Sequence, residues 1–118
     1  MAENRLYVKV ENKQAKLIEQ TFELVCDNSD YEVVFDFDRE WETHTIKTAI
    51  FVFGKTTVKR IFDGNICKGV AVEDTNLLYI GVTSDNIRTT TSAEVTCVKQ
   101  SITSIADKIK DPSNLLYN

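Results

Sequence analysis

Apolar and polar side chains alternate through much of this chain, and this period of two constrains the fold more than any other feature. Every second residue is apolar in Leu6–Val10, in Phe22–Cys26 and in Val33–Phe37. Successive side chains of a β-strand point to opposite faces, so this alternation predicts strands with one face in a core. We expect eight strands, at about Arg5–Val10, Phe22–Cys26, Glu32–Phe37, Thr45–Phe53, Thr56–Phe62, Ile66–Lys68, Leu77–Val82 and Ala93–Val98.

Short turn sequences separate the expected strands. Gly54-Lys55 lies between two runs rich in β-branched and aromatic residues, and a glycine at the first central position suits a type II′ hairpin. Asp63-Gly64-Asn65 marks another tight turn, which favours a meander of consecutive strands. The predicted fold class is therefore all-β, an antiparallel β-sandwich of about eight strands, immunoglobulin-like or jelly-roll-like. Strand spacing leaves a partly closed barrel open as well.

The period changes near the end of the sequence. Ile102, Ile105, Ala106 and Ile109 are spaced to fall on one face of a helix, and Asp111-Pro112 would end that helix. We therefore expect two parts, a β-sandwich domain over residues 1–100 and a short C-terminal helix with an exit segment over residues 101–118.

Size and charge set the broad class. The 118 residues suit one domain, and the net charge of -4 with scattered Lys and Arg argues against a nucleic-acid partner. The first residues lack the pattern of a signal peptide, and no apolar run is long enough to cross a bilayer, so we expect no membrane contact and synthesis in a cytoplasm.

The three cysteines show no metal or redox spacing. Cys26, Cys67 and Cys97 are odd in number and form no C-x-x-C pair. We expect small buried side chains on strands, with a disulfide or a metal site as the alternative.

Few residues are candidates for chemistry. His44 is the single histidine, and we expect it exposed in a loop without a nucleophile beside it. The acidic residues at every second position from 36 to 42 could bind calcium or act as a hydrolase pair. Counted as an EF-hand from Asp36, however, the loop has Trp41 where glycine is needed and Lys47 where glutamate is needed. We therefore predict a solvated strand face, no enzyme, no metal and no cofactor.

Trp41 is the single tryptophan and has two interpretations. A tryptophan directly after a strand commonly covers one end of a sandwich and enlarges its core. Together with the four tyrosines, the same ring could instead form a platform on which a sugar stacks. We expect the core position and keep the platform as the alternative.

The segment around Trp41 carries a resemblance to a known family. An F-x-F-D-x-E-W pattern over Phe35–Trp41 is followed by K-T-A-x-F over Lys47–Phe51. Together they resemble the amino-terminal module of baseplate and tail-fibre proteins of tailed bacteriophages, including upper baseplate proteins. The likeness extends from Phe22 to Tyr117 through four further segments, Asp63–Cys67, Leu77–Val82, Arg88–Thr91 and Asp111-Pro112. One departure is Gly69 with Val70–Val72, where such proteins often carry Pro and Trp.

The resemblance implies a virion structural protein and not an enzyme. Such a module would attach to other tail or baseplate proteins, assemble as a homo-oligomer such as a trimer, and reside in the virion after synthesis in the host cytoplasm. The expected interface residues are Ile102, Ile105, Ile109 and Trp41. Two alternatives stay open: a carbohydrate-binding β-sandwich that recognises a host surface, and a small host-directed inhibitor acting through the acidic cluster from Asp36 to Glu42.

Overall fold

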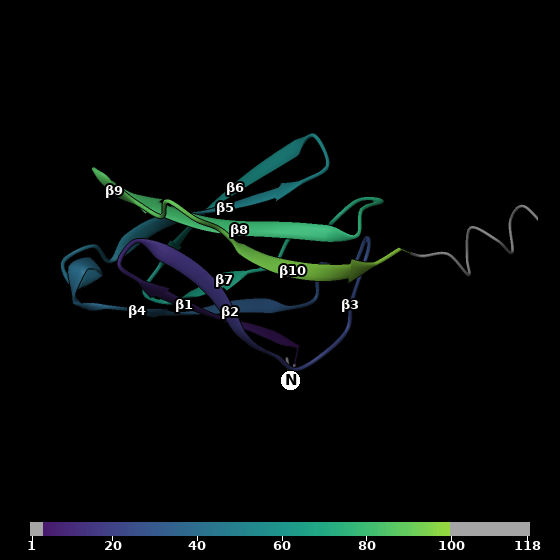
Figure 1. Cartoon of the computed structure of the whole chain (residues 1–118), viewed down its shortest axis with the longest axis horizontal. Coiled ribbons are helices and arrows are strands. Elements are labelled where there is room, and N and C mark those ends of the chain that lie inside the picture. The colour runs from purple at the N-terminus through teal and green to yellow at the C-terminus, as the bar shows by residue number, and fades with distance from the viewer. Residues whose placement is uncertain (1–3, 100–118) are drawn as a thin grey trace, which may run out of the picture.

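The computed structural model describes residues 4–99, which form ten strands in two mixed sheets (Figure 1). One of the sheets is curved into half a barrel. The first sheet has the order β2 (Gln14–Gln20), β1 (Arg5–Glu11), β4 (Glu32–Phe37) and β7 (Ile66–Lys68). The second has the order β3 (Leu24–Val25), β10 (Ala93–Val98), β8 (Leu77–Ser84), β5 (Ile46–Phe53) and β6 (Thr56–Asp63), with β9 (Ile87–Arg88) paired to β8. Within residues 4–99 the one helical element is the 3-10 turn η1 (Arg39–Trp41).

The all-β class is confirmed, but the purely antiparallel arrangement is wrong. β1 and β4 run parallel from the pair Arg5 and Glu32 to the pair Val10 and Phe37, and β3 runs parallel to β10. Parallel neighbours need a crossover connection. Here β2 first folds back on β1, and residues 21–31 then visit the second sheet as β3 before the chain returns as β4.

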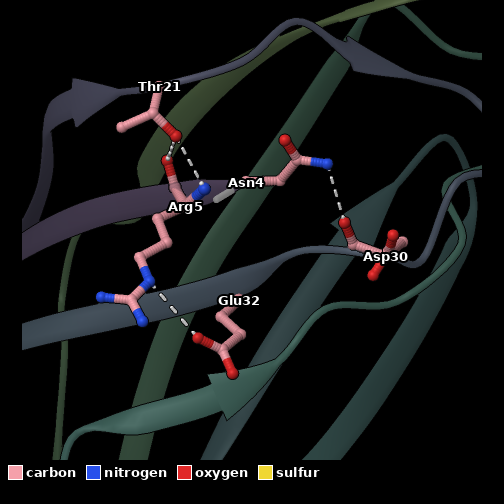
Figure 2. Close-up of polar contacts among 5 residues, drawn as sticks. All are labelled: Asn4, Arg5, Thr21, Asp30 and Glu32. Atoms are coloured by element: carbon pink, nitrogen blue, oxygen red, sulfur yellow. Dashed lines mark hydrogen bonds and ion pairs between the residues drawn. The ribbon is translucent and has the colours of Figure 1, made fainter. Parts of the chain in front are cut away.

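Polar contacts hold the start of the parallel pair together (Figure 2). The Arg5 guanidinium lies 3.4 Å from a Glu32 carboxylate oxygen, across the first pair of the ladder. Thr21 Oγ1 accepts a hydrogen bond from the Arg5 backbone N–H at 2.9 Å, and Asn4 Nδ2 donates to the Asp30 carbonyl at 3.0 Å. These contacts join both ends of the crossover to the first strand.

The meander is wrong as well, although its turns exist. Gly64 has a positive φ of 82° between β6 and β7, as the turn requires, but these two strands belong to different sheets. The hairpin at Gly54-Lys55 is confirmed: Phe53 pairs with Thr56, and Gly54 has a φ of 59°. Two strands, β2 and β9, have no counterpart among the eight expected, and only two residues of the expected strand Phe22–Cys26 are paired, as β3.

One hydrophobic core lies between the sheets. It includes the inward-facing residues of β1, β4, β5, β8 and β10. The three cysteines are buried in this core as free thiols. Cys67 and Cys97 lie on strands as expected, whereas Cys26 lies in the turn that follows β3. Burial raises the pKa of Cys67 and of Cys97 to about 11.

Gly69 lies against the ring of Tyr31, and this contact explains why residue 69 is a glycine. The Tyr31 hydroxyl donates to the Val70 carbonyl at 2.7 Å and accepts from the Val70 N–H at 3.1 Å. A Cβ atom at residue 69 would lie 2.4 Å from the ring. Such a contact is far below van der Waals distance, so only glycine fits beside this ring without a shift of the backbone or of Tyr31.

We expect Gly69→Ala to destabilise the fold by about 1–3 kcal/mol, the range for overpacking a well-filled interior. Urea unfolding monitored by circular dichroism measures the loss. The control is the same change in a Tyr31→Ala background, where no ring opposes the new methyl group and the additional loss should nearly vanish. Equal losses in both backgrounds would contradict the contact.

Candidate functional site

The chain makes a sharp corner after β4, and Asp38 fixes it in place. The Asp38 backbone N–H donates to the Val10 carbonyl at 3.0 Å, and its carboxylate accepts from the Asn12 N–H at 2.9 Å. The Asp38 carbonyl in turn accepts the Trp41 N–H at 3.1 Å. The β1–β2 turn therefore positions η1, which carries Trp41 into the core. We call residues 36–47 the tryptophan corner.

Trp41 is 2% exposed and belongs to the core, which confirms the core interpretation. Its ring centre lies 5.1 Å from that of Phe37 at the end of β4. A ring buried in this way offers no open face on which a sugar could stack. The other expected interface residues, Ile102, Ile105 and Ile109, lie outside the described residues.

Lys47 is a buried cation in the tryptophan corner and is not among the site residues expected from the sequence. It is 4% exposed, and its ammonium donates to the carbonyls of Thr45 at 3.2 Å and Gly64 at 2.7 Å. The ammonium also lies 4.6 Å from the centre of the Phe37 ring and 5.7 Å from that of Phe62. Burial lowers the pKa of Lys47, and the nearby Asp63 charge opposes this shift.

Strand parity could have revealed Lys47. In β5 the buried positions are Lys47, Ala49, Phe51 and Phe53, while Ile46 faces solvent. The lysine thus occupies a core position of a regular alternation. A charged residue at such a position needs its own acceptors, and the turn at Gly64 supplies one of them.

We expected His44 to be exposed, but it is only partly exposed because its ring packs against Trp41. Its side chain is 18% exposed, and its ring stands edge-on to Trp41 with 6.3 Å between centres. Its Nδ1 atom lies 3.5 Å from a carboxylate oxygen of Asp85. Ser84 lines the same side of the molecule, but its hydroxyl donates to the Ile46 carbonyl at 2.7 Å and not to the histidine. Within the described residues, His44 therefore has an orienting acid but no nucleophile bonded to it.

The alternating acids do not form one strand face, because β4 ends at Phe37 and η1 follows. Asp36 lies 3.4 Å from the Lys9 ammonium, and Glu40 forms an ion pair with Lys13. With Asp38 bonded to Asn12, these acids join the corner to the β1–β2 hairpin. In the described part of the chain, no three His, Cys, Asp or Glu side chains are placed to hold a metal ion.

A second surface runs along β6, the last strand of its sheet. Lys59, Arg60 and Ile61 of β6 line a groove of about 550 Å³, with Ile66 and Lys68 of β7 on its other side. We call this surface the β6 edge. Ile61 is 76% exposed, more than any other large apolar side chain in residues 4–99, and Ile66 is 48% exposed. No motif in the sequence indicates a role for this strand, but Ile61 points to the face opposite the buried Phe62, where an apolar side chain is unexpected.

Comparison of the chain with protein-family models, with curated proteins and with solved structures gives no match. No helix among residues 4–99 has both the length and the hydropathy to cross a membrane.

Proposed function

We propose that this protein is an attachment module of a tailed-phage virion, an adaptor in the baseplate or tail fibre that binds a neighbouring protein through the β6 edge. The observation that carries the attachment role is a long edge strand with an exposed isoleucine in its middle. The phage setting rests on the resemblance of Phe35–Trp41 and Lys47–Phe51 to baseplate modules.

An exposed strand edge presents unpaired backbone N–H and C=O groups that another chain can bind. Basic residues on an edge strand, such as Lys59 and Arg60, commonly protect that edge against unwanted pairing. Ile61 does not fit that explanation, because an apolar side chain favours association. It also has an apolar diagonal neighbour on β5, since Ile61 pairs with Thr48 and Ile46 lies two residues away on the same face.

The symmetry of the assembly is part of the proposal. Tails repeat their proteins around an axis, so a closed ring of copies such as a trimer fits the setting. Contact between copies through Ile102, Ile105 and Ile109 stays a prediction. The finer fold class, an immunoglobulin-like or jelly-roll-like sandwich, also stays a prediction. Such sandwiches are built of antiparallel sheets, whereas each sheet here contains a parallel pair.

The virion location is tested on particles of the phage that encodes the chain. We expect antibody raised against this protein to label the tail tip in electron micrographs, and peptides of the chain to be found in purified particles by mass spectrometry. Particles that lack both the label and the peptides would overturn the phage setting, while leaving the attachment role of the β6 edge to its own test.

The attachment role predicts that Ile61→Lys abolishes binding to the neighbouring tail protein without weakening the fold. Stability should change by no more than about 0.5 kcal/mol, since the side chain is already in solvent. Assembly is measured by incorporation of the purified variant into particles that lack the native protein. The matched control is Ile18→Lys, which changes another exposed isoleucine, on β2. Normal assembly by both variants would contradict the role of the β6 edge.

A further inference from the structure

Two buried polar atoms of the tryptophan corner, Asp38 Oδ1 and Trp41 Nε1, have no hydrogen-bond partner in the described chain. His44 Nδ1 also lacks a hydrogen bond, but it lies 3.5 Å from a carboxylate oxygen of Asp85. Two further buried atoms lack a hydrogen bond, Arg5 Nε and Glu32 Oε1, but these form an ion pair with each other (Figure 2). Among residues 4–99, the two atoms with neither a hydrogen bond nor an ion pair therefore come from one short stretch of chain.

Asp38 and Trp41 line one hollow of about 480 Å³, together with His44. Lys47, Gly64 and Thr45 also line it, and the Lys47 ammonium has three N–H groups, for which the structure gives two acceptors. Buried polar groups in folded proteins are almost always paired with protein or with ordered water, so two unpaired ones beside a single hollow indicate a partner from outside the chain. The volume lies within the range of small-molecule sites.

The unpaired atoms define the chemistry of that partner. Trp41 Nε1 can only donate a hydrogen bond, and the Lys47 ammonium can only donate. Asp38 Oδ1 accepts when the carboxylate is ionised. A partner must therefore accept at one point and donate at another, which a hydroxyl group does with a single atom.

The charges around the hollow favour a neutral molecule. Three carboxylates, from Asp36, Asp38 and Glu42, are opposed by the cations of Arg39 and Lys47. A strong anion would meet the carboxylates, and a strong cation would meet the buried ammonium. The half-buried Phe37 adds an apolar wall to the hollow, which suits the C–H groups of a sugar or polyol.

We propose that the tryptophan corner binds a neutral, hydroxyl-rich small molecule, a monosaccharide or a similar polyol, through Trp41 Nε1, Lys47 Nζ and Asp38 Oδ1. This site is separate from the β6 edge and goes beyond the attachment role. It also differs from a stacking platform, because the Trp41 ring is buried and contributes its N–H group. Recognition is by hydrogen bonds at the end of the core.

The single tryptophan makes the test direct, because the protein has one indole N–H signal in a nitrogen-15 correlation spectrum. The probes are glucose, galactose, N-acetylglucosamine and glycerol, titrated separately to millimolar concentrations. We expect at least one of them to shift the indole signal and the Gly64 amide signal saturably, with one binding constant for both. The absence of a saturable shift with every probe would overturn the proposal.

Variants then test the assigned atoms. Asp38→Asn keeps an oxygen for the Asn12 N–H but turns the unpaired acceptor into a donor, so binding should weaken about tenfold. Trp41→Phe removes the N–H donor, and its binding is measured through the Gly64 amide once its folding has been verified. The control is Glu94→Gln, an exposed acid on β10 that should bind like the native protein. Equal binding by Asp38→Asn and the native protein would overturn the assignment. A complex in which the indole N–H contacts only bound water at a saturating probe concentration would overturn it as well.

Discussion

Trp41→Ala is expected to lower the free energy of unfolding by about 3–5 kcal/mol, the usual loss when a large aromatic side chain is removed from a core. Trp41 is among the largest fully buried side chains of the described chain, and its ring packs between Phe37 and the edge of His44. Its removal leaves a cavity at the end of the core and frees the η1 turn. Urea unfolding followed by far-ultraviolet circular dichroism measures the loss, since the variant has no tryptophan fluorescence.

The control for this prediction is Trp41→Phe, which keeps an aromatic ring in contact with Phe37. Its loss should be clearly smaller, by about half or more, because less volume is removed. A Trp41→Ala protein that unfolds at the same urea concentration as the native chain would show that the ring is peripheral to stability. That outcome would restore the interpretation of Trp41 as a surface for ligands or partners.

Local patterns in the sequence predict the strands whose alternation ends in a well-marked turn. Gly54 between β5 and β6 is the clearest case, since both flanking runs are long and glycine supplies the positive φ. β2 escaped prediction because it covers little of the core: of Gln14–Gln20 only Ala15 is buried. Ala15 and Leu17 share its inner face, but Glu19 follows them there and Ile18 lies on the outer face, so the alternation is too short to detect.

The order of the strands could not be predicted, because it is decided by contacts between distant segments. Nothing in the alternation of β4 distinguishes a parallel neighbour from an antiparallel one. The pairing of β4 with β1 depends on the crossover through residues 21–31 and on contacts such as Arg5 with Glu32. Likewise, the sequence indicates the turn at Asp63-Gly64-Asn65. It does not indicate that the chain passes there from one sheet to the other.

The candidate sites also differ in how far the sequence could have indicated them. Lys47 at a buried position and Ile61 at an exposed one both break the alternation of their strands, so parity alone could have marked them. The convergence of Asp38, Trp41 and His44 on one hollow depends on the η1 turn and on the Asn12 backbone, which binds Asp38 from 26 residues away. Such a convergence is visible only in the folded chain.

Alkaline pH is expected to destabilise the protein, because two buried thiols resist ionisation. Burial raises the pKa of Cys67 and of Cys97 from 9.0 to about 11. Between these values the unfolded chain releases the thiol protons and the folded chain keeps them, so the free energy of unfolding falls as pH rises. Each thiol contributes a slope of about 1.4 kcal/mol per pH unit at most. Solvent near the strand ends screens part of this, and we expect a loss of roughly 3 kcal/mol for the pair.

The sign of the effect separates the thiols from the other buried titratable groups. Lys47 has a lowered pKa, so its contribution makes the fold more stable as pH rises, and it opposes the thiols. Burial raises the pKa of Tyr31 from 10.0 to about 12, so it acts in the same direction as the thiols but begins at higher pH. The double variant Cys67→Ala with Cys97→Ala keeps both of these groups. Its urea midpoint should start lower near neutral pH and then fall less than that of the native chain between pH 9.0 and about 11. Parallel curves for the two proteins would mean that the thiols ionise equally in the folded and unfolded chains, and that their burial does not govern the alkaline limit of the fold.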